Sequence, residues 1–297
     1  MTAEERYATP AAFRRALTDR LKTMAGETRW TLPQLQRQVA YDRLLERLYL
    51  VDDGWIVKGA TALLARDLGV RGSLDVDIYR EAAREVAEAE LRHGAAADLG
   101  DWFRYGLGAG SVIGNDGIRL PVNAVIGTTT WVSFHVDLVG SDLRMTGQPE
   151  EVPPLARGAI PDVSQRGYRA YPLADHVADK VAATYERHGE TQAPSTRYRD
   201  LVDLVAIIKG AWVDSQAQTT ALMSEFRRRG LVRPRCFDVP DRALWETGYA
   251  AEARRSLLDT APTLGEALAA VRPFIDPVLD ESATGRWNPK ERRWSAP

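Results

Sequence analysis

The sequence contains almost no cysteine. The single cysteine among 297 residues, Cys236, cannot form an internal disulfide, which excludes a disulfide-stapled fold and fits a reducing compartment. Long apolar runs are also missing, since no stretch approaches the ~18 consecutive apolar residues of a membrane span. The first ten residues contain early acids and no apolar run, so they do not resemble a signal peptide. We therefore expect a soluble cytoplasmic protein that does not span a membrane.

Neither sign of charge is in excess. The chain has 39 basic and 41 acidic residues, so a nucleic-acid site would have to be a local patch. The four histidines do not have zinc-type spacing. The sequence also has no G-x-x-x-x-G-K-[ST] phosphate loop and no G-x-S-x-G nucleophile elbow. Zinc chemistry, P-loop chemistry and serine-hydrolase chemistry are therefore poorly supported.

The order of elements predicts an α+β fold. The length favours two domains, and 44% hydrophobic residues suffice for a sizeable core. Two N-terminal helices precede a mixed core, with short strands predicted over 55–58 and 73–79 and β-rich segments at 102–107, 117–126 and 128–140. We place one domain at 1–170 and a helical domain at 171–297. The last sixteen residues, 282–297, are expected to be a loop or disordered. Helices are predicted over 172–188, 199–210, 214–229, 241–257 and 264–279.

Two carboxylates interrupt an apolar strand in the stretch Ser-Leu-Asp-Val-Asp-Ile. Asp75 and Asp77 face the same side because strand residues two apart point the same way. Asp137, inside the apolar run VSFHVDLVG, is a third candidate on a half-buried strand. Buried carboxylates are costly unless a cation neutralises them, and Mg²⁺ prefers oxygen ligands. The three carboxylates therefore predict a metal site, although a simple ion pair between Asp75 and Arg71 is the alternative.

A glycine turn lies just before this strand. Gly59 follows a short strand and precedes a helix that we expect to begin near Thr61. Backbone N–H groups at the start of a helix can bind phosphate. Lys58 precedes the turn and could point into the site or away from it.

Together these motifs resemble a known family. They occur in the order K-G-A-T-A-L at 58–63, R-G-S-L-D-V-D at 71–77, a lysine at 180 and R-D-L-V-D-L at 199–204. This order is similar to that of the AbiEii/MenT nucleotidyltransferase toxins, within the superfamily related to DNA polymerase β. The resemblance covers roughly residues 50–210. It implies a nucleotidyltransferase-like mixed β-sheet core with N-terminal helices and a C-terminal helical bundle.

The resemblance also implies roles for the matching residues. Lys180 would contact nucleotide phosphates, and Asp203 would position or deprotonate the acceptor hydroxyl. Ala60 departs from the pattern, because many relatives have Gly or Ser there and a serine hydroxyl could reach the phosphates. The implied catalytic residues are Asp75, Asp77, Lys180 and Asp203, the implied nucleotide-binding residues are Lys58, Gly59, Ala60, Thr61, Arg71, Ser73 and Asp200, and the metal ligands are Asp75, Asp77 and Asp137.

Each distal residue also has an ordinary structural interpretation. A lone lysine in a helix, such as Lys180, is usually a solvated surface residue. Asp200 and Asp203 share a helix face, and Asp200 lies in the first turn, where a negative charge favours the helix dipole. Ser73 could equally be a polar residue at the start of a strand.

The family implies a substrate and partners. We expect a toxin that uses Mg²⁺ or Mn²⁺ to transfer a nucleotide from an NTP, with CTP as one candidate, to the 3′ end of tRNA. That transfer would block aminoacylation and translation. We also expect a cognate antitoxin and a monomeric chain. The alternatives are transfer to a protein or small-molecule hydroxyl, or a non-catalytic nucleotide- or partner-binding module.

A basic cluster is the candidate RNA-binding surface. Arginine suits phosphate contacts, and a single-stranded RNA end is accessible to them. A solvated helix end is the alternative interpretation. The cluster comprises Arg227, Arg228, Arg229, Arg233 and Arg235.

Overall fold

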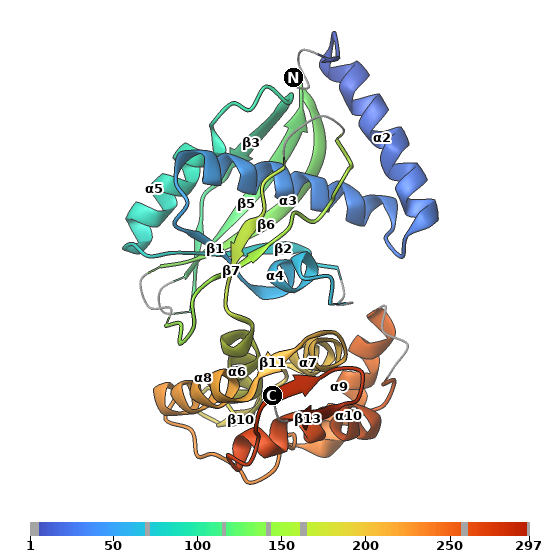
Figure 1. Ribbon diagram of the computed structural model, residues 1–297. Coiled ribbons are helices and arrows are strands. Elements are labelled where there is room, and N and C mark those ends of the chain that lie inside the picture. Colours follow the sequence, from blue (N-terminus) through green and yellow to red (C-terminus); the bar gives the residue numbers. More distant parts are fainter. Residues whose placement is uncertain are drawn as a thin grey trace. The chain divides into compact units, whose positions relative to one another are not determined.

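The computed structural model describes residues 6–68, 72–114, 117–140, 144–160, 165–256 and 261–295. The chain divides into two compact units, which we describe separately (Figure 1). The first unit consists of Met1–Ala65, Ser73–Leu143 and Glu151–Ala170, and the second of Arg66–Gly72, Arg144–Glu150 and Tyr171–Pro297.

The first unit is built on a mixed sheet, which confirms the α+β fold. The strand order is β3-β5-β6-β2-β1-β8-β7, with β4 paired to β5. Strands β2 and β6 run parallel, as do β1 and β8, whereas β1–β2, β3–β5 and β5–β6 are antiparallel. The elements are α2 (Pro10–Glu27), α3 (Leu32–Val51), β1 (Trp55–Val57), α4 (Gly59–Ala65), β2 (Asp75–Arg80), α5 (Arg84–Ala95), β3 (Phe103–Leu107), β4 (Ser111–Ile113), β5 (Gly117–Ile126), β6 (Thr129–Val139), β7 (Glu150–Val152) and β8 (Tyr168–Ala170).

The first two helices both begin after a threonine that caps the first turn. Thr9 caps α2 by accepting a hydrogen bond from the Ala12 N–H, and Pro10 occupies the first helical position, where its missing N–H costs nothing. Helix α3 begins after Thr31, which forms a capping box with Gln34. Helix α2 extends to Glu27.

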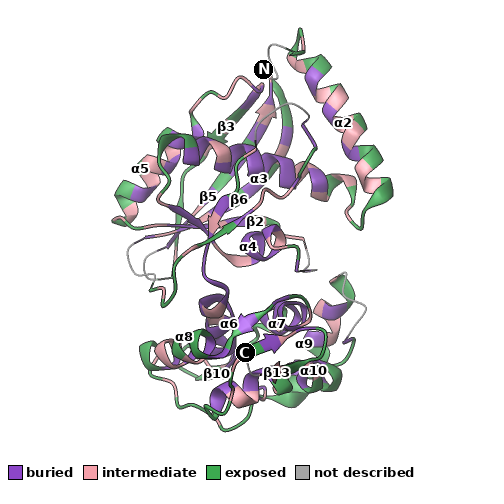
Figure 2. Ribbon diagram, in the orientation of Figure 1, coloured by how far each residue is buried: buried purple, intermediate pink, exposed green. Residues whose placement is uncertain are grey.

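Alternation along the strands separates an apolar face of the sheet from a polar one. On β6, Phe134, Val136 and Leu138 are buried, whereas the residues between them are partly or fully exposed. Helix α3 contributes to the same core, where Tyr41 packs edge-on against Phe134 with ring centroids 4.8 Å apart. Figure 2 shows buried residues along α3 and exposed positions on α2. The period of two thus directs the polar side chains of neighbouring strands to a common face.

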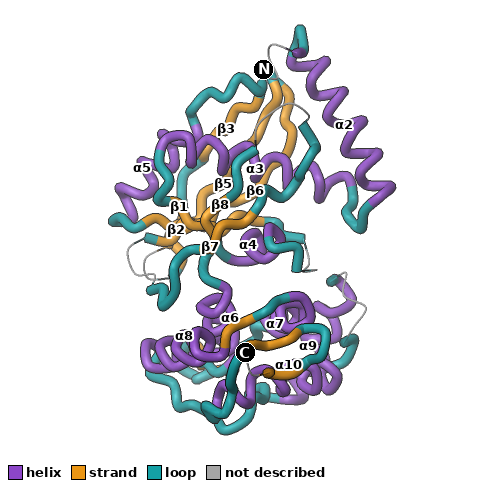
Figure 3. Tube along the Cα trace, in the orientation of Figure 1, coloured by secondary structure: helices purple, strands orange, loops and turns teal. Residues whose placement is uncertain are grey.

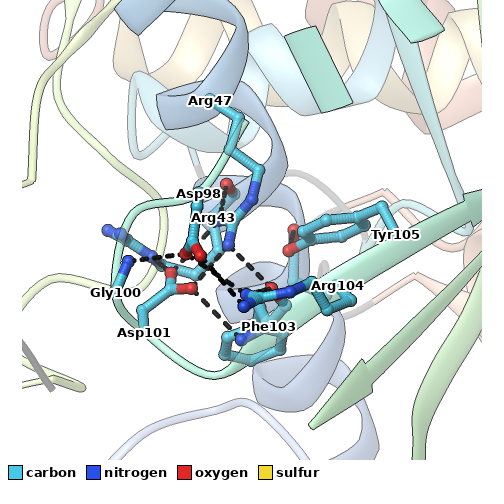
Figure 4. Close-up of polar contacts among 9 residues, drawn as sticks. Arg43, Arg47, Asp98, Gly100, Asp101, Phe103, Arg104 and Tyr105 are labelled. Carbon is cyan, nitrogen blue, oxygen red and sulfur yellow. Dashed lines mark hydrogen bonds and ion pairs between the residues drawn. The ribbon is translucent and has the colours of Figure 1, made fainter. Parts of the chain in front are cut away.

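A buried ion network joins α3 to the start of β3 (Figure 4). The Arg43 Nε atom lies 2.6 Å from Asp101, and Arg47 contacts both Asp101 oxygens, at 2.5 and 3.1 Å. Arg47 also donates to the Phe103 carbonyl and lies over the Tyr105 ring. Burial alone would raise the pKa of Asp101, but Arg47 and Arg43 outweigh it and hold the pKa below its ordinary value.

The second unit is mainly helical, as Figure 3 shows. The five helices predicted between residues 172 and 279 are confirmed, with boundaries that differ by a few residues. The elements are α6 (Leu173–Thr184), β9 (Arg187–His188), β10 (Ala193–Pro194), α7 (Tyr198–Gly210), β11 (Val213–Asp214), α8 (Ser215–Arg228), α9 (Arg242–Arg255), α10 (Leu264–Leu279), β12 (Arg286–Asn288) and β13 (Arg293–Ser295).

The prediction that residues 282–297 form an irregular tail is wrong for the part that the structure describes. Strands β12 and β13 form a hairpin, and β12 also pairs with β11. Trp287 is fully buried, and its indole N–H donates to the Ile208 carbonyl at 2.7 Å. Trp294 stacks on Phe274, with ring centroids 4.9 Å apart. Burial of these aromatic rings orders a segment whose sequence has no periodicity.

Candidate active site

Strands β2 and β6 bring the three predicted carboxylates to one face of the sheet. In this parallel pair, Asp77 is opposite Asp137 and Asp75 is opposite His135. Val76 and Ile78 alternate with the two aspartates of β2 and are fully buried on the other face. The three carboxylates therefore lie on adjacent strands.

The glycine turn packs directly against this carboxylate face. Gly59 has a φ of +56°, in the left-handed region that favours glycine. A Cβ atom added at Gly59 would lie 1.9 Å from Asp77 Oδ2, so the carboxylate occupies the space that any other side chain would need. The Lys58 N–H donates a hydrogen bond to the Asp77 carbonyl at 2.8 Å. Gly59 is therefore required both by backbone conformation and by the position of Asp77.

Two hydroxyl groups bind the backbone of Asp75. Thr61 Oγ1 and Ser73 Oγ both donate to the Asp75 carbonyl, at 3.2 and 2.6 Å. Thr61 is fully buried and Ala60 nearly so. These hydrogen bonds hold helix α4 and the segment before β2 against the first residue of the strand. Arg71, the predicted partner of Asp75 or of phosphate, lies outside the described residues.

Arg119 is a site residue that the sequence did not reveal. It lies on β5 opposite Asp137, and its guanidinium donates to both Asp137 oxygens, at 2.7 and 2.6 Å. The same Arg119 Nη2 atom lies 3.6 Å from Asp75. On the other side, His135 Nδ1 lies 3.4 Å from an Asp75 oxygen. Only the strand register, which the sequence does not display, brings these side chains to the carboxylates.

The site suits a cation. The hydrogen bonds to Asp137 raise the pKa of Arg119 above its ordinary value against the opposing effect of partial burial, and the charges of Asp75 and Asp77 act in the same direction. All three carboxylates offer the oxygen ligands that Mg²⁺ and Mn²⁺ prefer. Within the described ranges, however, no group of three or more acidic, histidine or cysteine side chains is arranged to hold a metal ion. The guanidinium is the cation that Asp137 and Asp75 contact here.

An open cleft of about 690 Å³ lies beside Asp75. Strands β3, β5 and β6 supply its walls, and the side chains along it include Arg119, His135, Asn123 and Ser133. The Ser133 hydroxyl donates to the Asn123 side chain at 3.1 Å. The cleft thus combines cationic and hydrogen-bonding groups next to the carboxylates.

The second unit contains a separate buried ion cluster. Lys180 is 5% exposed, and its Nζ atom lies 2.8 Å from both Asp200 and Asp203. Arg197 contacts the other oxygen of Asp200. Burial alone would lower the pKa of Lys180, but the two aspartates outweigh it and hold the pKa above its ordinary value. Lys180 is therefore not a solvated surface lysine, although its predicted contact with phosphate stays a prediction.

The basic cluster is partly neutralised within the second unit. Arg229 is mostly buried and contacts Asp179, Glu186 and Glu225. Arg228 contacts Glu225, and Arg233 lies 2.5 Å from Glu281. The two other members, Arg227 and Arg235, are exposed and have no ion pair within the described part of the chain.

The class to which this chain belongs is that of the nucleotidyltransferases. A glycine turn leads into a short helix, and the following strand presents two aspartates beside a third. A family model for the nucleotidyltransferase AbiEii toxins of type IV toxin–antitoxin systems matches residues 43–287. The chain belongs to this family, as the resemblance at the sequence level implied. A comparison with curated proteins finds no match.

Several solved structures are similar to this chain. MenT4, a nucleotidyltransferase toxin from Mycobacterium tuberculosis, is 18% identical, with a TM-score of 0.48 over 86% of this chain and 92% of that chain. JHP933 from Helicobacter pylori is 13% identical, with a TM-score of 0.47 over 82% and 91% of the two chains. Another H. pylori structure, named "putative nucleotidyltransferase", is 14% identical, with a TM-score of 0.44 over 82% of this chain and 94% of that chain. No helix within the described residues is long and apolar enough to cross a membrane.

Proposed function

We propose that this chain transfers a nucleoside monophosphate from an NTP to the 3′ end of tRNA and thereby blocks aminoacylation and translation. The acceptor oxygen would form a bond to the α-phosphorus while the bond to the leaving pyrophosphate breaks. Family membership supports the class of reaction. CTP is one candidate donor.

The observation that carries the proposal is the convergence of Asp75, Asp77 and Asp137 on one face of two paired strands. Their oxygen atoms would hold Mg²⁺ or Mn²⁺, which when bound would stabilise the charge on the transferring phosphoryl group. The cleft beside Asp75 is open enough to admit a substrate next to these carboxylates.

The glycine turn supports a position for the donor in the first unit. We propose that its backbone and Lys58 contact the nucleotide. The hydroxyl groups of Thr61 and Ser73 already donate to the Asp75 carbonyl, so we propose that they act by fixing the first residue of β2. Ala60 offers only its backbone, which makes main-chain donors more important here than in relatives with serine.

In the second unit we propose that Lys180 binds phosphate and that Asp203 positions or deprotonates the acceptor, with Asp200 holding Lys180 in place. Lysine is a natural point-charge partner for phosphate oxygens. Arg227 and Arg235 are exposed, and we propose them as contacts to the RNA backbone. A cognate antitoxin, a cytoplasmic location and a monomeric state complete the proposal.

The test is label transfer from each of the four α-³²P-labelled NTPs to total tRNA in the presence of Mg²⁺. We expect label on intact tRNA and none on tRNA whose 3′ end has been oxidised with periodate, because oxidation removes the hydroxyl nucleophile. A lysate freed of RNA serves as the protein acceptor control. Label on protein alone, or no transfer from any NTP, would reject the tRNA proposal.

A further inference from the structure

Arg119 is a cationic side chain that contacts the carboxylates of both β6 and β2. Its guanidinium faces Asp137 in a two-pronged contact and reaches towards Asp75 at 3.6 Å. These two carboxylates lie on different strands, β6 and β2, so Arg119 links both sides of the carboxylate face from a third strand, β5. With Asp77 included, these four side chains carry one positive and three negative formal charges, −2 in sum.

Simultaneous binding of a metal ion and the Arg119 guanidinium to Asp137 is unfavourable in free energy. Both Asp137 oxygens already accept charge-assisted hydrogen bonds, at 2.7 and 2.6 Å. A divalent cation bound to either oxygen would lie within a few ångströms of the guanidinium charge, and like charges at that separation repel strongly. Arg119 is 41% exposed and lines the open cleft, so its side chain has space to withdraw.

We infer that Arg119 is an exchangeable counter-ion that competes with the divalent cation for Asp137 and Asp75 and so sets the metal affinity of the site. The inference rests on the proposed function, because it takes these carboxylates as the metal ligands. Without metal, the guanidinium keeps the carboxylates together. When metal binds, Arg119 moves off Asp137 into the cleft, where its fork of N–H donors faces the space open to an anionic substrate.

Binding of Mn²⁺ alone to the full chain, measured by electron paramagnetic resonance, tests this inference without NTP, tRNA or turnover. We expect Arg119→Gln to lower the Kd for Mn²⁺ about fivefold, the factor that corresponds to the upper end of the range for a half-exposed ion pair. Arg119→Lys keeps the positive charge but loses the two-pronged guanidinium contact. Its Kd for Mn²⁺ should therefore lie between those of the wild type and Arg119→Gln. Arg104→Gln is the matched control, because Arg104 lies on β3 of the same sheet and pairs with Asp98 instead. Its Kd should equal that of the wild type.

A second measurement keeps the test decisive if Arg119→Gln weakens the fold. Mn²⁺ should raise the melting temperature of Arg119→Gln more than that of the wild type, because the tighter binder is stabilised more at equal metal concentration. An equal or weaker Mn²⁺ affinity in Arg119→Gln would overturn the inference and leave the proposed function standing. No Mn²⁺ binding by either protein would overturn the inference together with the proposed metal dependence.

Discussion

A buried carboxylate on α3 gives the sharpest prediction about stability. Asp42 is 2% exposed and accepts hydrogen bonds from the Leu155 and Ala156 N–H groups, at 2.9 and 2.8 Å, and from the Tyr168 hydroxyl. Burial raises the pKa of Asp42 to about 6, although these hydrogen bonds act in the opposite direction. Replacement of Asp42 by asparagine removes the titration. Its one oxygen can accept from Leu155 and Tyr168, which both donate to Oδ1, whereas its NH2 group faces the Ala156 N–H, and this adds a loss of stability that does not vary with pH.

The sign and size of the pH dependence of stability follow from the difference in the pKa of Asp42 between the folded and unfolded states. The folded protein binds the Asp42 proton more tightly than the unfolded chain, whose pKa is about 3.9. The protonated carboxyl therefore contributes its full stabilisation below about pH 4, and this is lost as the pH rises through about 6. A difference of about two pKa units at 1.36 kcal/mol each corresponds to ~3 kcal/mol.

Urea unfolding at a series of pH values measures this effect. We expect the stability of Asp42→Asn relative to the wild type to rise by ~3 kcal/mol between about pH 4 and pH 7. Tyr168→Phe leaves the carboxylate in place and should retain the pH dependence, which separates titration of Asp42 from loss of packing. A difference between Asp42→Asn and wild type that does not vary with pH would refute the reasoning.

Three further substitutions test the packing around the two ion clusters and the turn. Gly59→Ala should lower the free energy of unfolding by ~2 kcal/mol or more, because its Cβ meets Asp77 and its φ is left-handed; an unchanged urea midpoint would contradict this. Lys180→Met leaves two buried aspartates without their shared lysine and should cost about 3–5 kcal/mol by chemical unfolding, whereas a solvated lysine would cost almost nothing. Asp101→Ala leaves Arg43 and Arg47 buried without their carboxylate and should lower stability by about 3–5 kcal/mol in thermal melts; a melting temperature equal to that of wild type would show that the network contributes little.

Local patterns in the sequence predict much of this fold. The threonine and proline before α2 locate its start because capping and a fixed φ act within a few residues. Alternation in DVDI and VSFHVDLV identifies two strands, the first with two carboxylates on one face and the second with one. Periodicity likewise predicts the five helices of the second unit.

What the sequence does not reveal depends on contacts between distant segments. Arg119 looks like an ordinary polar residue of an alternating strand, and only the β5–β6 register places it on Asp137. Lys180 has a paired, buried charge because a second helix brings two aspartates to it. The C-terminal strands lack any periodic signal, and the burial of Trp287 orders them. Such long-range pairing cannot be read from local propensity.

The central claim is that the carboxylates of β2 and β6 carry nucleotide transfer. Its most direct test compares the initial rate of label transfer to tRNA by wild type, Asp75→Asn and Asp98→Asn, with Asp98 as an exposed aspartate of the same unit that pairs with Arg104. We predict that Asp75→Asn loses roughly a hundredfold or more of the rate and that Asp98→Asn retains it. Transfer by Asp75→Asn at the wild-type rate would contradict the account.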